Sequence, residues 1–311
     1  MGKASRTKQD SDRRARIKAQ QEAQRRSEQR KRLLLAGGSI VVVVIVVIAI
    51  VLVKLNSGGS STTTTGASNG PTGTALTSVV NNATSVPAST LDTVGSGSGS
   101  VTAVPKAITG QPPLTSGGLP EVFYDGAEYC PYCAAERWAM VVALSRFGTF
   151  TGLSTVHSSS TDTDPNTPTF TFAKATYTSK YLVFDHVEET TNVPNGSGGY
   201  TALQTPSAAQ QALLKKYDYP PYVSSTSEGS IPFIDFGNQA EIVGASYDPG
   251  ILAGKSWATI ASSLNDPTTT YAKAIDGTAN YITASICHLT NNQPASACTA
   301  TVQKLETSIF S

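Results

Sequence analysis

Apolar and polar positions follow strand-like and helix-like spacings through the second half of the chain. The short apolar run Glu121–Tyr124 is typical of a strand. After it, Ala134–Phe147 carries Trp138, Val141 and Val142 at the spacing of one helix face. A strand followed directly by a helix predicts a domain that mixes the two, in the α/β class.

The same pattern predicts further elements toward the C-terminus. In chain order they are strands at Leu153–His157, Thr169–Phe172 and Tyr181–Val187, a helix at Gln204–Tyr217, strands at Ile231–Phe236 and Ala240–Val243, and a helix at Trp257–Leu264. A Gly-Asn pair separates the last two strands and predicts a tight turn. The tail from Tyr271 is predicted to form two helices around a polar loop.

One apolar run is long enough to cross a bilayer. Leu33–Val53 is 21 residues without a charge, which as a helix spans roughly 30 Å. We predict one transmembrane helix at 33–53. A cleaved signal peptide is the alternative, but the preceding basic region and the run itself are too long and no A-x-A site follows closely.

Charge is distributed unevenly on the two sides of that run. Residues 1–32 carry 12 Lys or Arg and 4 Asp or Glu, whereas the chain from Asn56 onward carries 10 and 18. We therefore expect a basic cytoplasmic N-terminus near lipid headgroups, in a single-pass protein of the cell membrane whose C-terminal part is extracytoplasmic. A nucleic-acid arm is the alternative, which we disfavour because no aromatic residues are interleaved; no nucleic-acid partner is expected.

Composition divides the remainder into a linker and a folded domain. Residues 54–118 are rich in Ser, Thr and Gly and poor in aromatic residues, which predicts a flexible linker. Residues 119–311 are long enough for a hydrophobic core and are expected to form the extracytoplasmic domain.

The chemistry of the chain centres on Cys130-Pro-Tyr-Cys133, which lies between the predicted strand and helix. Cys130 would stand exposed at the helix N-terminus, where free N–H groups and the helix dipole favour a thiolate. Cys133 would lie one turn further on and deeper. We predict a catalytic redox pair, against the alternative of a permanently oxidised structural disulfide. Asp125 and Glu136 are near enough in sequence to influence the thiols, but solvated or capping roles are preferred for both.

Four cysteines in an exported domain suit an oxidising compartment. Of three pairings, the one that keeps Cys130 with Cys133 leaves Cys287 with Cys298, predicted as a structural disulfide in the C-terminal hairpin. A second redox pair remains open. A zinc site with His288 is disfavoured because the ten residues between the last two cysteines match no usual zinc motif. No metal and no cofactor are expected.

The order of predicted elements resembles the thioredoxin-like superfamily across roughly residues 119–266. This resemblance implies a thioredoxin-like fold with an insertion after the second strand and a C-terminal helical extension. In that superfamily a cis-proline faces the cysteines, and Pro232 after Ile231 holds the matching position. The resemblance implies that the Ile231 backbone binds an extended peptide substrate. An ordinary proline at the start of a strand is the alternative for Pro232.

A closer resemblance covers most of residues 119–311. The segments Tyr129–Trp138, Ser145–Gly148, Pro165–Pro168 and Tyr177–Tyr181 resemble a bacterial and archaeal family of membrane-anchored proteins of unknown function that carries a CPYC motif. The tetrapeptide is also similar to that of glutaredoxins, but the outward location and the added segments give no ground for glutathione use.

Two functions from different classes follow. The first is a membrane-anchored extracytoplasmic thiol–disulfide oxidoreductase acting on protein thiols and disulfides, with a membrane redox partner as a further expectation. The second is a redox-silent, thioredoxin-like adaptor that binds another protein of the cell envelope. Reactivity of Cys130 toward an alkylating agent distinguishes them.

Overall fold

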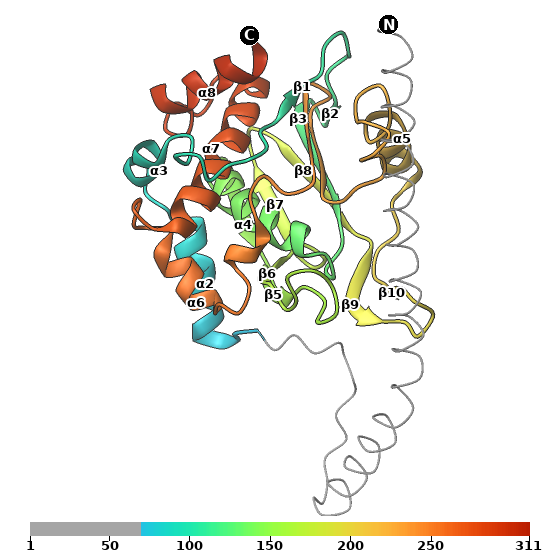
Figure 1. Ribbon diagram of the computed structural model, residues 1–311. Coiled ribbons are helices and arrows are strands. Elements are labelled where there is room, and N and C mark those ends of the chain that lie inside the picture. The colour runs from blue at the N-terminus through green and yellow to red at the C-terminus, as the bar shows by residue number, and fades with distance from the viewer. Residues whose placement is uncertain (1–69) are drawn as a thin grey trace, which may run out of the picture. The chain divides into compact units, whose positions relative to one another are not determined.

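The computed structural model describes residues 70–311, which lie within one compact unit, Thr65–Ser311. The basic segment 1–32 and the predicted transmembrane helix at 33–53 lie outside the described residues. Within residues 70–311, no helix is both long and apolar enough to cross a membrane. The described part is a mixed α/β structure (Figure 1).

A six-stranded sheet forms the centre of the molecule. Its strands lie in the order β1 (Lys106–Ala107), β12 (Ala240–Val243), β11 (Phe233–Phe236), β3 (Leu119–Gly126) and β2 (Thr115–Ser116), and β8 (Val183–Glu188) also pairs with β3. The β3–β8 pair is parallel, with Tyr124 opposite His186, and the other pairs are antiparallel. Between β11 and β12, Gly237 and Asn238 both have positive φ, at 62° and 59°, as the predicted tight turn requires.

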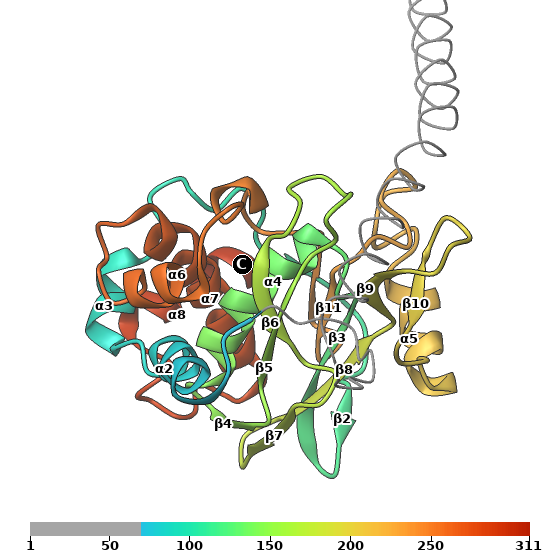
Figure 2. The same cartoon turned by 90° about the horizontal axis from the view of Figure 1, so that it is seen from below.

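Helices cover both faces of this sheet. On one face lies α4 (Pro131–Leu144), in which every residue except Tyr132 is buried. A helix that is buried on all sides needs neighbours on all sides, and α4 contacts α7 (Thr270–Leu289), the strand β6 (Pro168–Thr171) and an N-terminal helix described below. The opposite face is covered by α5 (Ala208–Tyr217), and Figures 1 and 2 show α5 on the other side of the sheet from α4 and α7.

The insertion lies elsewhere than predicted. The expected second strand, at Leu153–His157, is β5 (Ser154–His157), but it pairs only with β6 in a separate two-stranded sheet. A second small sheet joins β4 (Gly148–Thr151) to β7 (Thr176–Ser179). The strand parallel to β3 is β8, so the additional segment precedes the second strand of the central sheet instead of following it. Both segments form strands, and the pairing partner identifies the one that belongs to the central sheet.

The predicted linker at 54–118 is wrong for its described part. Residues 70–118 contain α2 (Gly73–Thr84) and α3 (Ala88–Val94), which contact α4, α6 (Trp257–Ser263) and α7. Val79 and Ala83 on α2, and Leu91 and Val94 on α3, are buried in the core or against it. Their i, i+4 and i, i+3 spacings make one apolar face on each helix, which average composition conceals.

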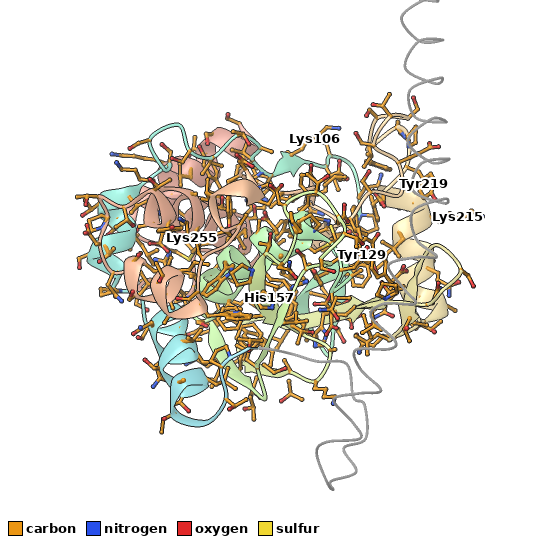
Figure 3. The ribbon with its side chains drawn as sticks, turned by 60° about the horizontal axis from the view of Figure 1, so that its bottom comes forward. Lys106, Tyr129, His157, Lys215, Tyr219 and Lys255 are labelled. Atoms are coloured by element: carbon orange, nitrogen blue, oxygen red, sulfur yellow. A yellow bond between two sulfur atoms is a disulfide. The ribbon has the colours of Figure 1, made fainter. Side chains whose placement is uncertain are left out.

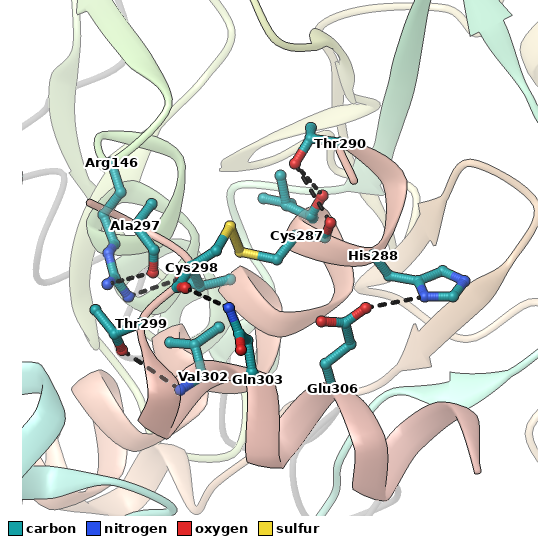
Figure 4. Close-up of a disulfide and its surroundings, with 12 residues drawn as sticks. Arg146, Cys287, His288, Thr290, Ala297, Cys298, Thr299, Val302, Gln303 and Glu306 are labelled. Atoms are coloured by element: carbon teal, nitrogen blue, oxygen red, sulfur yellow. Dashed lines mark hydrogen bonds and ion pairs between the residues drawn. A yellow bond between two sulfur atoms is a disulfide. The ribbon is translucent and has the colours of Figure 1, made fainter. Parts of the chain in front are cut away.

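The C-terminal helices are joined by a disulfide (Figure 4). Cys287 in the last turn of α7 bonds to Cys298, just before α8 (Ala300–Phe310), over a sequence separation of 11 residues. Arg146, after the end of α4, donates to the Ala297 carbonyl at 2.7 Å and so ties this segment to the central helix. The predicted pairing is therefore present.

Candidate functional site

Cys130 lies at the junction of the central strand and the central helix. β3 ends at Gly126, and Cys130 is the N-cap of α4, with Pro131 in the first helical position. Proline suits that position because its missing N–H would have no partner within the helix. The Cys133 backbone N–H donates to Cys130 Sγ at 3.4 Å, so the sulfur takes the place of a capping oxygen.

Both cysteines are free thiols and both are buried. Cys130 is 5% exposed and Cys133 is 0% exposed, so Cys133 is the deeper of the two, as predicted. The expectation that Cys130 is exposed is wrong, because the segment before β11 covers it: its thiol donates to the Ile231 carbonyl at 3.8 Å. The Ile231–Pro232 peptide bond is cis, as expected from the resemblance.

The pKa values of the two thiols are shifted in opposite directions. A hydrogen bond with the Cys133 thiol is the main cause that lowers the pKa of Cys130. Backbone N–H groups of the first helical turn and the Arg137 charge act in the same direction, while burial opposes them. Burial is the main cause that raises the pKa of Cys133 well above its usual range. Cys130 is therefore the thiol that ionises first.

The loop between Gly126 and Cys130 is fixed by neighbouring segments. Backbone hydrogen bonds of 2.7–2.9 Å hold it: Glu189 N–H to Gly126 O, Glu128 N–H to Thr190 O, and Ser159 N–H to Tyr129 O. The Tyr129 ring stacks on Tyr200 of the β9–β10 hairpin (Thr190–Pro194 and Tyr200–Ala202) at a centroid distance of 4.2 Å. In Figure 3, Tyr129 lies between Lys255, which precedes α6, and Lys215 on α5. The loop between β5 and β6 and the β9–β10 hairpin thus shape the surroundings of Cys130.

Arg137 lies one turn after Cys133 and is completely buried. Its two terminal nitrogens donate to the Ala127 carbonyl at 3.4 and 3.2 Å, and Nη1 is 3.5 Å from Glu188 Oε2. Sequence reasoning did not identify this ion pair. The i, i+4 spacing of Arg137 from Cys133 was the available signal, whereas Glu188 comes from β8 and has no local signal.

Tyr124 completes the surroundings of Cys133. A Cβ atom built on Gly126 would lie 2.2 Å from Tyr124 Oη and 3.1 Å from Cys133 Sγ, so both atoms flank the same point. Any side chain larger than glycine's hydrogen would collide there. Among the described residues, the Tyr124 hydroxyl is buried without a hydrogen-bond partner. Tyr124 was treated only as part of a strand in the sequence.

The two carboxyls singled out near the cysteines are buried, which is contrary to the preferred solvated or capping roles. Glu136 is fully buried and accepts from Ser246 N at 2.8 Å and Ser246 Oγ at 3.1 Å, and burial raises its pKa to about 7. Asp125 is on β3 but next to Tyr124, so its side chain lies on the other face of the strand. Burial, reinforced by Glu189, raises the pKa of Asp125 to about 8.

Metal ligands are not assembled in the described part of the chain. No group of three or more His, Cys, Asp or Glu residues within 70–311 is arranged to hold a metal ion.

The comparisons with known proteins give one match. The model of a family described as Domain of unknown function (DUF929) matches residues 107–288, which include the CPYC loop, the Ile231–Pro232 segment and the sheet between them. No curated protein and no solved structure matches the chain. Because the matched region is more than half of the 311 residues, the chain belongs to the family described as Domain of unknown function (DUF929).

Proposed function

We propose that this protein is a thiol–disulfide oxidoreductase that acts on protein thiols and disulfides through Cys130 and Cys133. The observation that carries the proposal is the position of Cys130. Its sulfur caps the first turn of α4 and contacts the Ile231 carbonyl at 3.8 Å. A thiol of lowered pKa at a helix N-terminus, with a second thiol one turn behind it, is the arrangement that thiol–disulfide exchange uses.

The arrangement of elements around the cysteines supports a thioredoxin-like architecture. β3 leads through the CPYC loop into α4, β8 returns parallel to β3, and the antiparallel pair β11–β12 follows with α6 after it. This is the element order on which the resemblance to that superfamily rests. On this interpretation α2, α3, the two small sheets, α7 and α8 are additions to a smaller core.

The proposed exchange has two balanced steps. The Cys130 thiolate attacks one sulfur of a substrate disulfide, which forms a mixed disulfide and releases the other substrate sulfur as a thiolate. Cys133 then attacks the Cys130 sulfur, and the second substrate sulfur leaves with the proton that Cys133 gives up. Two electrons pass from the cysteine pair to the substrate, and the reverse sequence oxidises a substrate dithiol.

The Ile231 segment supports a peptide as substrate. The Ile231 carbonyl faces Cys130, and within the described residues its backbone N–H donates no hydrogen bond. An extended peptide that pairs with this backbone would present its own cysteine to Cys130. The β9–β10 hairpin stands beside the same loop through Tyr129 and Tyr200.

The proposed location is the outer side of the cell membrane. The apolar run Leu33–Val53 and the basic residues before it support a single-pass anchor with a cytoplasmic N-terminus. The Cys287–Cys298 disulfide suits an oxidising compartment. Such a protein requires a redox partner for turnover, and a membrane-bound electron carrier is the partner that fits this location.

The experiment that tests the proposal traps the mixed disulfide. Replacement of Cys133 by Ala removes the resolving thiol, so substrates should remain bonded to Cys130 and migrate as larger species on a non-reducing gel. The matched control is Cys130→Ala, which leaves the buried Cys133 and should trap nothing. If Cys130 in the reduced wild-type protein reacts with neither iodoacetamide nor an aromatic disulfide, the oxidoreductase proposal is wrong.

One observation favours the second candidate, a redox-silent adaptor. Cys130 is only 5% exposed, whereas an exchange reaction needs a sulfur that the substrate can reach. The adaptor would bind an envelope protein without covalent chemistry. It predicts capture of the same partner by the Cys130→Ala variant, which the oxidoreductase proposal does not.

A further inference from the structure

The deep side of the cysteine pair presents a chemical problem that the proposed exchange must solve. Cys133 is 0% exposed, and burial holds its pKa well above the usual range. In the second step of the exchange, the same sulfur must become negative while it attacks Cys130. A buried thiolate is costly unless donors or positive charge stand beside it.

We propose that Tyr124 and Arg137 are positioning residues that stabilise the Cys133 thiolate as it attacks the mixed disulfide. This inference rests on the proposed function and adds the groups that make its second step possible. Tyr124 would donate its hydroxyl hydrogen to the Cys133 sulfur, and Arg137 would supply the compensating charge. Neither residue contacts the substrate.

The first observation concerns the hydroxyl of Tyr124. Its hydroxyl and Cys133 Sγ flank the position of a Cβ on Gly126, at 2.2 and 3.1 Å from it. A buried hydroxyl without a partner destabilises a fold, and a phenylalanine would avoid that cost. The ring itself is held by an edge contact with Phe172 at 5.2 Å, which phenylalanine would preserve. The hydroxyl therefore lacks a role in the dithiol form and acquires one when Cys133 is negative.

The second observation concerns the guanidinium of Arg137. Its guanidinium is fully buried and held rigidly, because both terminal nitrogens bond to the Ala127 carbonyl. The backbone of the same Ala127 residue acts on Cys133 in the direction that lowers its pKa and favours its charged form. Arg137 lowers the pKa of both Cys130 and Cys133. Arg137 thus holds the residue whose backbone acts on the thiol and also supplies positive charge.

The other charged groups around the guanidinium are two glutamates. Glu188 Oε2 lies 3.5 Å from Nη1, and the carboxyl of Glu128 accepts from Thr171 Oγ1 at 2.7 Å while acting on Arg137 by its charge. Burial raises the pKa of Glu188 to about 7, against the opposing effect of Arg137. Glu188 and Glu128 therefore share the Arg137 charge with the thiols, whose pKa values Arg137 still lowers.

The proton and electron balance of the step is simple. The Cys133 sulfur forms a bond to the Cys130 sulfur, the bond from Cys130 to the substrate sulfur breaks, and the substrate leaves as a thiol with the proton from Cys133. Tyr124 keeps its own proton throughout. It donates a hydrogen bond that is stronger to the thiolate than to the thiol.

The test measures the second step in isolation, on the full-length chain in detergent. The reduced protein is mixed with an aromatic disulfide, 5,5′-dithiobis(2-nitrobenzoate). Attack by Cys130 releases one coloured thiolate, and attack by Cys133 on the mixed disulfide then releases the second. Cys133→Ser should stop after the first release and so calibrates the two phases.

For Tyr124→Phe we expect an unchanged first phase and a second phase slower by about tenfold, the effect of losing one hydrogen bond to a charged group. The matched control is Tyr247→Phe, which removes another buried hydroxyl near α4, one that donates to the Ala135 carbonyl at 2.7 Å. Tyr247→Phe should reduce stability and leave both phases at wild-type rates. A wild-type second phase in Tyr124→Phe overturns the inference.

Arg137→Lys separates charge from position. It keeps the positive charge but loses the two-pronged contact with Ala127, so the second phase should slow and the pH dependence of Cys130 alkylation should change little. Arg146→Lys, just after the end of α4 and bonded to the Ala297 carbonyl, is the control and should leave both phases unchanged. If the wild-type protein shows no second phase at all, the proposed function fails together with the inference. A normal wild-type reaction with unaffected variants refutes the inference alone.

Discussion

Asp125 offers the sharpest prediction about stability. Its side chain is 4% exposed, and among the described residues its Oδ1 atom is buried without a hydrogen-bond partner. Burial is the main cause that raises its pKa to about 8, and the nearby carboxyls Glu189, Asp218 and Glu188 raise it further. The perturbation is Asp125→Asn, which preserves the shape of the side chain and cannot ionise.

The direction of the effect follows from the two pKa values. Below the unfolded-state value of about 4, both states hold the proton and Asp125 carries no electrostatic penalty. As the pH rises toward about 8, the unfolded chain releases this proton and the folded chain retains it, so the stability of the wild-type protein falls. The Asp125→Asn variant does not lose stability in this way, so its free energy of unfolding relative to that of the wild-type protein should increase with pH.

The magnitude can be worked from the same values. Each pH unit between the two pKa values corresponds to about 1.4 kcal/mol, so the interval from pH 5 to pH 8 gives on the order of 4 kcal/mol as an upper bound. Relaxation around the ionised carboxyl reduces this figure, and we expect roughly 2 kcal/mol or more. Asp235 and Glu241 have pKa values raised to about 7, mainly by burial, and neither acts on Asp125, so they add to the pH dependence of both proteins equally.

The assay is urea unfolding of both proteins at pH 5 and pH 8 under reducing conditions, with the free energy of unfolding compared at each pH. Asp266→Asn is the control. The pKa of Asp266 is lowered by hydrogen bonds from Thr268, so this group is ionised in both states across the interval. Its effect on stability should be independent of pH. An Asp125→Asn effect that is equally large at pH 5 and pH 8 would refute the reasoning.

Three further outcomes are expected. Replacing Cys287 and Cys298 together by Ala opens a loop with a separation of 11 residues and should lower the free energy of unfolding by roughly 3 kcal/mol, measured by urea unfolding without reductant. Gly126→Ala pushes a methyl group against the hydroxyl and sulfur beside it and should cost roughly 1–3 kcal/mol, with a lower melting temperature as the readout. Leu91→Ala, at a site 1% exposed, should cost roughly 2–5 kcal/mol by thermal unfolding, whereas Leu203→Ala, at 36% exposed, should change little; equal effects would contradict packing of α3 on the core.

Local features of the chain were predictable because their causes lie within a few residues. The CPYC loop between a strand and a helix, the Gly-Asn turn and the C-terminal helix pair all follow from spacing, capping and turn chemistry. The pairing of Cys287 with Cys298 was found by assigning the adjacent cysteines to each other first. The expectation of a family of unknown function agrees with the family that matches residues 107–288.

Features that depend on contacts between distant segments could not be predicted from local sequence. Composition marked residues 54–118 as a linker, but burial of Leu91 against α7 decides that the described part is folded. The segments 153–157 and 183–188 were both expected as strands, and only tertiary pairing makes the second one the parallel partner of β3.

The sequence by itself determined that Cys130 and Cys133 form a pair at a helix N-terminus, because that junction is local. Only the tertiary structure decided their environment. Folding places Ile231 over Cys130, and it brings Glu188 from a neighbouring strand to Arg137 behind Cys133. Burial and the sign of nearby charges control a thiol's reactivity, and both depend on residues far apart in the chain.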